Sequence, residues 1–208
     1  MLQKQTVAPN TFSVLKELMA ISELNNFQLV GGTALSLRLG HRVSVDIDLF
    51  SNEPFENDNI ISVLKKYFGE RLAVISKREN RLGVFSFIDD IKIDICRHPQ
   101  KLIREIIEEE DIRMWSLEDI AAAKVNAVSR RAVKKDFWDI DILLDRFNIF
   151  EITDFFQKKY DPMLAIAVSK MLTYYDDAEE SDTPDCLLNK NWPQVKKSIY
   201  KKINNHTK

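Results

Sequence analysis

The chain has little net charge and only two cysteines. Among 208 residues, 30 lysines and arginines nearly balance 32 aspartates and glutamates, for a net charge of -2. A protein whose main task is to coat nucleic acid is normally strongly basic, so this balance argues against that class and leaves room only for a local basic patch. The two cysteines, Cys96 and Cys186, lack the close spacing of a zinc site. We expect them to be ordinary reduced thiols.

Long apolar runs are missing as well. No segment approaches the roughly 20 apolar residues that span a bilayer, and the first residues do not combine a basic start with an apolar run, as a signal peptide does. We therefore expect a cytoplasmic protein that has no membrane partner. Hydrophobic residues still make up 45% of the chain, which is enough for a substantial core.

Glycine is scarce too, and all five glycines lie in the first 83 residues, where the β signals gather. Short runs rich in Val, Ile, Leu or Phe, bounded by turn or polar residues, predict strands over 27–30, 44–49, 72–76, 83–88 and 91–96. From Ser116, a predicted N-cap, the pattern is helical. Further helices are predicted over 133–147, 151–159, 162–177 and 192–204. The sequence thus predicts an α+β fold, with an α/β domain over residues 1–110 and a helical domain over 111–208.

Asp46 and Asp48 stand two residues apart in the second predicted strand. Alternate side chains of a strand share a face, so both carboxylates point the same way, while Val45, Ile47 and Leu49 are expected to point into the core. Adjacent carboxylates repel each other, and a hard cation with oxygen ligands, Mg²⁺ or Mn²⁺, would offset that repulsion. The alternative for so short a motif is an exposed edge strand with two solvated aspartates.

Gly31 and Gly32 follow an apolar run and precede a short predicted helix that Gly40 ends. At such a junction of strand, turn and helix, backbone N–H groups can approach a phosphate, and Thr33 can add a hydroxyl. A tight turn that binds nothing is the alternative. The thirteen residues between Gly32 and Asp46 are enough for the chain to cross back. A phosphate site and the carboxylates would then lie together.

A third carboxylate, Asp94, lies in the strand predicted over 91–96, on the face opposite its isoleucines. Beside the first two aspartates it would complete a cluster that can hold two metal ions. One ion would activate an attacking oxygen and the other would hold a leaving pyrophosphate. Asp90 shares that face, but Asp89 and Asp90 have the pattern of the turn that precedes the strand. We therefore prefer Asp94.

Lys124 lies on the apolar stripe of the helix that begins after Ser116. A lysine there either extends its amine to solvent or meets a negative partner, and the functional interpretation is a phosphate-binding lysine that faces the carboxylates across a cleft. Residues 130–135 carry four cations, which would steer a triphosphate or an RNA end, although a solvated helix face is the alternative. Asp136 and Asp139, one helical turn apart, are placed to orient Lys124, the arginines or the acceptor.

Together these segments closely resemble the AbiEii/AbiGii toxin family of the polymerase-β-like nucleotidyltransferase superfamily. The resemblance rests on LVGGTAL at 29–35, HRVSVDIDLF at 41–50, Asp94, Lys124, and KDFWDI at 135–140. It covers roughly residues 27–145, and the combination is specific although each piece is not. It implies a nucleotidyltransferase core with a mixed sheet, followed by a helical domain that closes the active-site cleft.

The resemblance also implies roles for single residues. The expected metal ligands and catalytic carboxylates are Asp46, Asp48 and Asp94, and the further catalytic candidates are Lys124, Asp136 and Asp139. The residues expected to bind the nucleotide are Gly31, Gly32, Thr33, Arg42 and Ser44. One of the last two aspartates, Asp136 or Asp139, would match a later motif of the family, and the sequence does not decide which.

The implied activity is metal-dependent transfer of a nucleoside monophosphate from an NTP to an acceptor hydroxyl, with release of pyrophosphate. The family includes toxins of abortive-infection toxin–antitoxin systems, and studied members add nucleotides to tRNA acceptor ends or bind GTP. The resemblance therefore implies a tRNA or other RNA acceptor and an antitoxin from an adjacent gene as partners. Because a fold does not settle the substrate, two alternatives stay open. One is nucleotidylation of a small molecule such as an antibiotic, and the other is a non-catalytic nucleotide-binding module.

Overall fold

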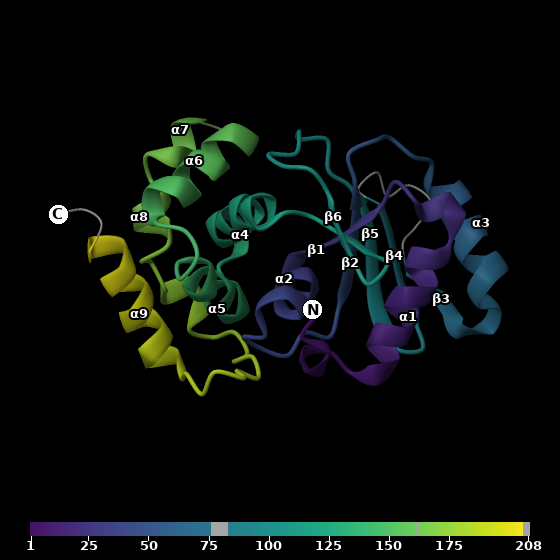
Figure 1. The fold of residues 1–208 in the computed structure, drawn as a ribbon, viewed down its shortest axis with the longest axis horizontal. Coiled ribbons are helices and arrows are strands. Elements are labelled where there is room, and N and C mark those ends of the chain that lie inside the picture. Colours follow the sequence, from purple (N-terminus) through teal and green to yellow (C-terminus); the bar gives the residue numbers. More distant parts are fainter. Residues whose placement is uncertain (76–82, 161, 206–208) are drawn as a thin grey trace.

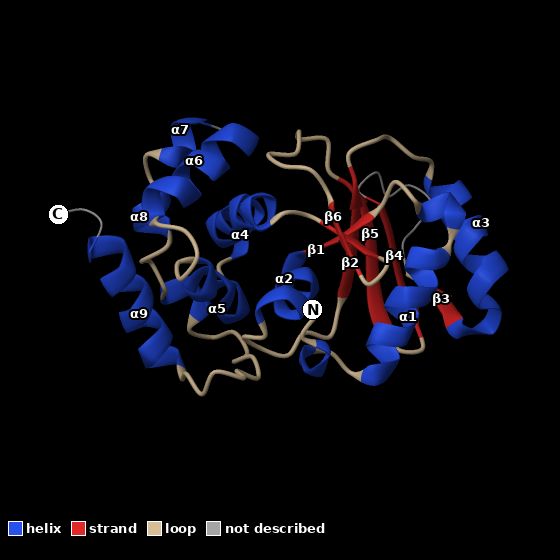
Figure 2. Ribbon diagram, viewed as in Figure 1, coloured by secondary structure: helices blue, strands red, loops and turns tan. Residues whose placement is uncertain are grey.

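A computed structural model describes residues 1–75, 83–160 and 162–205, and within these ranges seven strands form one mixed sheet (Figures 1 and 2). The strand order is β3-β4-β5-β2-β1-β7-β6. The strands are β1 (Gln28–Val30), β2 (Ile47–Ser51), β3 (Leu72–Val74), β4 (Gly83–Ile88), β5 (Ile91–Arg97), β6 (Ile107–Glu109) and β7 (Ile112–Met114). The predicted α+β fold with an N-terminal mixed sheet is confirmed.

Helices cover both faces of this sheet. The helices of the described residues are α1 (Pro9–Ala20), α2 (Gly31–Leu39), α3 (Asn57–Phe68), α4 (Leu117–Arg131), α5 (Lys134–Leu143), α6 (Ile149–Lys159), α7 (Pro162–Ala165), α8 (Val168–Met171) and α9 (Trp192–Asn205). Figure 1 shows α1 and α3 on one side of the sheet and α2 on the other, with α4, α5 and the later helices beyond α2. The C-terminal part is thus largely helical, as predicted. The division at residue 110 stays a prediction, and β7, which follows it, pairs in parallel with β1.

The central strands separate an apolar face from an acidic one. In β2 the side chains of Ile47 and Leu49 are buried, and they pair in parallel register with Ile93 and Ile95 of β5, which are buried as well. The same register places Asp48 opposite Asp94 on the other face. Equivalent residues of neighbouring parallel strands lie side by side. The sheet therefore brings these two carboxylates together.

The strand predicted over 44–49 begins only at Ile47. The buried Thr33 hydroxyl is hydrogen-bonded to the Asp46 carbonyl oxygen, which holds the preceding residues outside the sheet ladder. The prediction that Val45 faces the core is wrong, because its side chain is 63% exposed. The strands predicted over 27–30, 83–88 and 91–96 match β1, β4 and β5. Residue 76 of the strand predicted over 72–76, of which β3 is the observed part, lies outside the described residues.

The first predicted helix of the C-terminal part is confirmed, because the Ser116 side chain accepts a hydrogen bond from the Asp119 N–H at 3.0 Å and caps α4. The prediction of a single helix over 162–177 is wrong. Hydrogen bonds between residues three apart, from Ala167 N to Leu164 O and from Thr173 N to Lys170 O, interrupt it and leave α7, α8 and a 3₁₀ turn. The end of the predicted domain, residues 206–208, lies outside the described part.

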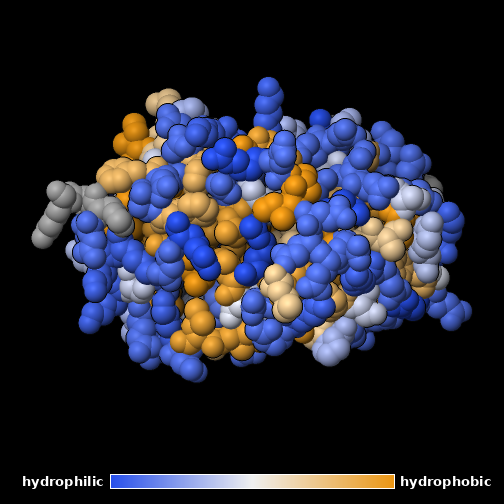
Figure 3. Space-filling model, viewed as in Figure 1, coloured by the Kyte–Doolittle hydropathy of each residue, from blue (hydrophilic) through white to orange (hydrophobic). Residues whose placement is uncertain are grey.

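The face seen in Figure 3 is hydrophilic over most of the sheet half, and apolar side chains gather over the helical half. Among the residues that the structure describes, no helix is both long and apolar enough to cross a membrane.

Candidate active site

A cavity of about 400 Å³ lies between the sheet and α4. The turn from β1 to α2, the acidic face of β2 and β5, and one face of α4 form its walls. The predicted residues that line it are Gly31, Gly32, Arg42, Ser44, Asp46, Asp48, Asp94 and Lys124. The structure thus brings eight of the eleven predicted site residues to one cavity. The other three, Thr33, Asp136 and Asp139, are buried behind its wall.

The carboxylate wall carries negative charge that the protein does not fully neutralise. Asp48 faces the cavity, and its burial and the neighbouring Asp94 raise its pKa to about 6. Asp94 Oδ1 is buried and has no hydrogen-bond partner among the described residues. Two close carboxylates, one of them with a free buried oxygen, make a set of hard donors that suits Mg²⁺ or Mn²⁺.

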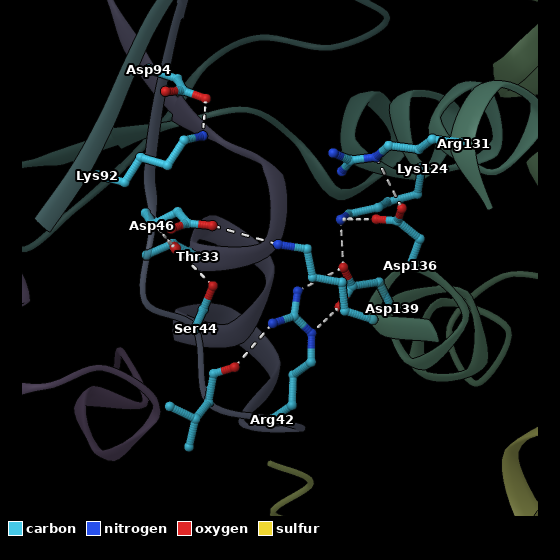
Figure 4. A network of polar contacts seen from close by, with 12 residues as sticks. Thr33, Arg42, Ser44, Asp46, Lys92, Asp94, Lys124, Arg131, Asp136 and Asp139 are labelled. Carbon is cyan, nitrogen blue, oxygen red and sulfur yellow. Dashed lines mark hydrogen bonds and ion pairs between the residues drawn. The ribbon is translucent and has the colours of Figure 1, made fainter. Parts of the chain in front are cut away.

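Two lysines bind the outer carboxylates (Figure 4). Lys92 Nζ lies 2.5 Å from Asp94 Oδ2, and Lys135 Nζ lies 3.5 Å from Asp46 Oδ2. In the described ranges, no three His, Cys, Asp or Glu side chains converge closely enough to form a metal site as they stand. The ammonium groups therefore compensate two of the three carboxylates and leave Asp48 without a direct cationic partner among the ion pairs of the described chain.

The glycine turn allows the backbone to approach these carboxylates. Gly31 has a φ of +68°, and a Cβ atom there would lie 2.5 Å from Asp48 Oδ2. A Cβ atom on Gly32 would overlap the Arg42 guanidinium. Val30, the N-cap of α2, makes no side-chain hydrogen bond to the helix. The first N–H groups of α2 thus keep their capacity to bind an anion.

Behind the opposite wall lies a buried ion network centred on Asp139 (Figure 4). Arg42 donates hydrogen bonds from Nε and Nη2 to the two oxygens of Asp139, at 2.7 and 2.9 Å. His41 Nε2 lies 2.7 Å from Oδ1 of the same carboxylate. Lys124 Nζ lies 2.5 Å from Asp139 Oδ2 and 2.9 Å from Asp136 Oδ1. Both aspartates bind Lys124, and Asp139 alone also binds Arg42 of the crossover loop, the segment between α2 and β2.

This network keeps its charges. Burial alone would raise the pKa of Asp139, but the adjacent Arg42 and Lys124 hold it well below its ordinary value. Burial alone would lower the pKa of Lys124, whereas Asp139 and Asp136 raise it. Two aspartates balance the two buried cations, Arg42 and Lys124. Arg131, whose Nε lies 3.4 Å from Asp136 Oδ2, adds a further cation with a side chain that is 58% exposed.

Sequence reasoning missed several residues of the cavity. Three of them continue the alternation of Asp48 and Asp94 along β2 and β5. Phe50 and His98 line the cavity, and Lys92 adjoins it through its contact with Asp94. The two-residue period of a strand predicts that these side chains share the face of the carboxylates. Tyr160, at the end of α6, reaches the cavity only through the packing of helices, which leaves no local signal.

Asp48→Asn is expected to stabilise the metal-free protein at pH 7. The pKa of this carboxyl is about 6 in the folded state and about 4 in an unfolded chain, so the folded state binds the proton more tightly. The free energy of unfolding therefore falls as pH rises from 4 to 6. Above pH 6 the full free-energy cost of ionising this buried carboxyl is present. The gain for the variant is expected to reach at most about 3 kcal/mol at pH 7 and to vanish near pH 4. Urea unfolding of both proteins at the two pH values measures it, and a gain that does not depend on pH would contradict the assignment.

Asp139→Asn is expected to destabilise the fold strongly, since it leaves Arg42 and Lys124 buried without their shared partner. Breaking a buried ion pair from one side costs about 3–5 kcal/mol. The matched control is Asp154→Asn, which removes the exposed pair between Asp154 and Lys158 and should cost less than about 1 kcal/mol. Equal unfolding free energies for the two variants would show that the network does not hold the site together.

The chain is similar to known proteins in both sequence and fold. The profile of a family described as nucleotidyl transferase AbiEii toxin, type IV toxin–antitoxin system, matches residues 13–162. An uncharacterized protein of Aquifex aeolicus (strain VF5), aq_aa25, is 28% identical over 195 residues, which cover 91% of this chain and 92% of the relative.

Two solved structures share the fold. MenT4, a nucleotidyltransferase toxin of Mycobacterium tuberculosis H37Rv, superposes with a TM-score of 0.63 at 15% identity, over 95% of this chain and 82% of its own. ANT(2″)-Ia, solved with adenylyl-2″-tobramycin, superposes with a TM-score of 0.55 at 18% identity, over 72% of this chain and 96% of its own. The family match covers more than half of the sequence, and the protein is accordingly a member of the AbiEii family of nucleotidyl transferase toxins of type IV toxin–antitoxin systems.

Proposed function

We propose that this protein transfers a nucleoside monophosphate from an NTP to an acceptor hydroxyl, with the aid of Mg²⁺ or Mn²⁺. The observation that carries the proposal is the register of β2 and β5, which places Asp48 beside Asp94 at the foot of a cavity with a glycine turn and cations on its walls. Carboxylates on one side and phosphate-binding groups on the other are what nucleotidyl transfer requires.

Asp46, Asp48 and Asp94 would hold the divalent cation, and their hard oxygen donors and the free Asp94 Oδ1 support this assignment. When bound, the cation would supply charge neutralisation of the triphosphate and activation of the acceptor hydroxyl. Lys92 and Lys135 compensate the outer carboxylates in the metal-free protein. Lys135, with a side chain 42% exposed at the cavity, is free to turn from Asp46 to a phosphate oxygen.

The remaining groups of the cavity suit the triphosphate. The uncapped N–H groups at the start of α2 and the Ser44 hydroxyl face it on one side. Arg42, whose guanidinium lies against Gly32, and Lys124 also line the cavity and would stabilise the charge of the leaving pyrophosphate. Asp136 and Asp139 do not reach the cavity, so we assign them as positioning residues that hold Lys124 and Arg42 in place.

For the acceptor we propose the hydroxyl of an RNA end, in particular that of tRNA. Two cations of the predicted run, Arg131 and Lys135, line the cavity and would attract a phosphate backbone. Lys134 instead donates to backbone oxygens of Glu179 and Ser181. Membership of a toxin family further supports an antitoxin partner, which we propose is encoded by an adjacent gene.

Incubation with Mg²⁺, one radiolabelled NTP at a time and total RNA tests the reaction. Wild type is expected to label a tRNA-sized band with at least one NTP, and Asp94→Asn is expected to lower the rate by about 100-fold or more. Asp154→Asn, on the surface of α6, is the matched control and should label as well as wild type. Undiminished labelling by Asp94→Asn would refute the assignment of this carboxylate. Label in a small molecule instead of RNA would refute the proposal that the acceptor is an RNA end.

In cells, expression of wild type without an antitoxin is expected to slow growth, because the transfer would consume an essential acceptor. Asp48→Ala, expressed to the same soluble level, is expected not to do so. The measurement is the growth rate after induction, with protein levels checked by immunoblot. Equal toxicity of the two proteins would mean that the toxic effect does not come from nucleotidyl transfer.

A further inference from the structure

One end of the cavity is built from aromatic side chains instead of charges. The rings of Phe50 and His98 lie stacked, with centroids 5.6 Å apart and an angle of 16° between their planes. Tyr160 meets His98 edge-on at 5.8 Å, and its hydroxyl lies 3.2 Å from His98 Nε2. Each of these rings is half-buried and lines the cavity. Trp115 packs against Phe50 and His98 from behind and is fully buried.

The alternation of the strands fixes where this aromatic end lies. Phe50 follows Asp48 by one repeat of the pleat, and residues of one face are spaced by about 7 Å along a strand. Cys96 of β5 and His98, which directly follows that strand, continue the face of Asp94 in the same direction. The glycine turn and Ser44 lie toward the other end, beside Asp46 and Asp48. The carboxylates thus separate the phosphate-binding end from the aromatic end.

The aromatic end does not attract anions. Lys159 Nζ lies 4.0 Å from the Trp115 ring centroid, but it is bound to Asp119 at 2.6 Å and its side chain is fully buried. Burial lowers the pKa of His98 to about 4, so this ring is neutral at pH 7. The opposite end holds Arg42, Lys124 and Lys135. Along the cavity a ligand therefore meets cations first, then carboxylates, then uncharged rings.

We propose that the aromatic end, formed by Phe50, His98 and Tyr160, binds the base of the incoming NTP. The inference rests on the proposed function and assigns the nucleoside subsite of the same cavity. An NTP has the matching order of parts, with the triphosphate at one end, the reacting α-phosphorus next, and a flat base at the other end. Partly exposed rings bind bases by stacking with little dependence on sequence.

The helical wall fits the same ligand. Ala123 and Ala127 stand one turn apart on α4 and line the cavity with the smallest side chains that a helix tolerates well. Asn126, which also lines it, is a polar group that can bond to the edge of a base. The reaction would bring together two bases, one from the donor NTP and one from the RNA acceptor. Of these, the donor base is covalently linked to the α-phosphate. Because this end adjoins the carboxylates that would hold the α-phosphate, we assign it to the base of the donor.

The test compares two kinds of ligand on the same protein, one with a base and one without. Isothermal titration calorimetry measures the affinity for each of the four NTPs and for inorganic tripolyphosphate, all with Ca²⁺ in place of Mg²⁺ to suppress turnover. The variants are Phe50→Ala, which removes a stacking ring, and Ala123→Leu, which enlarges a side chain of α4 that lines the cavity. Phe150→Ala, at an exposed position of α6, is the control. Circular dichroism and thermal unfolding establish that each variant is folded.

Stacking of one base is worth about 1–3 kcal/mol, so both variants are expected to weaken NTP binding about tenfold or more. Affinity for tripolyphosphate is expected to stay within about twofold of wild type, since it occupies only the other end. Unchanged NTP affinity in both folded variants would overturn the inference, and so would an equal loss for both ligands. If wild type bound neither tripolyphosphate nor any NTP, the proposed function would fall and this inference with it.

Discussion

The buried carboxylate of Asp139 is the contact on which the geometry of this site depends. It holds Arg42, from the loop between α2 and β2, against Lys124 of α4. The same guanidinium occupies the space that a side chain at position 32 would need. One charge therefore fixes the glycine turn, the crossover loop and the helical wall relative to one another. In a low-dielectric interior such a network persists only when each charge has its partner, which makes the arrangement specific.

The two walls of the cavity have opposite electrostatic characters, and this difference gives the site its chemistry. On one wall Lys124 of α4 and Arg42 of the neighbouring loop are balanced by aspartates behind them, so their charges are compensated without a ligand. On the sheet wall Asp48 and Asp94 repel each other, and Asp48 keeps a raised pKa as a result of burial and that repulsion. The fold thus tolerates an unfavourable charge at the place where a cation would be bound. Such local instability is common where preorganised charge serves function.

Much of the site was predictable from local sequence signals. The glycine pair and the Ser116 cap each depend on neighbours in the chain, so the sequence predicts them well. Asp46 and Asp48 both line the cavity as predicted, although only Asp48 lies in β2. The adjacency of Asp48 and Asp94 depends on the register between two strands distant in sequence, which the resemblance implied but no local pattern sets. The start of β2 was misplaced because a tertiary contact from Thr33 holds Asp46 outside the ladder. Tyr160 reaches the cavity through helix packing alone.

The central claim is that the carboxylates on β2 and β5 bind a divalent cation together with an NTP. Electron paramagnetic resonance tests it directly, because Mn²⁺ loses its free-ion signal when it is bound. The titration would use wild type and Asp94→Asn in the presence of a non-hydrolysable NTP. We expect wild type to bind Mn²⁺ and the variant to bind it at least about tenfold more weakly. Equal Mn²⁺ affinity in the two proteins would contradict the account, since Asp94 would then not be a ligand.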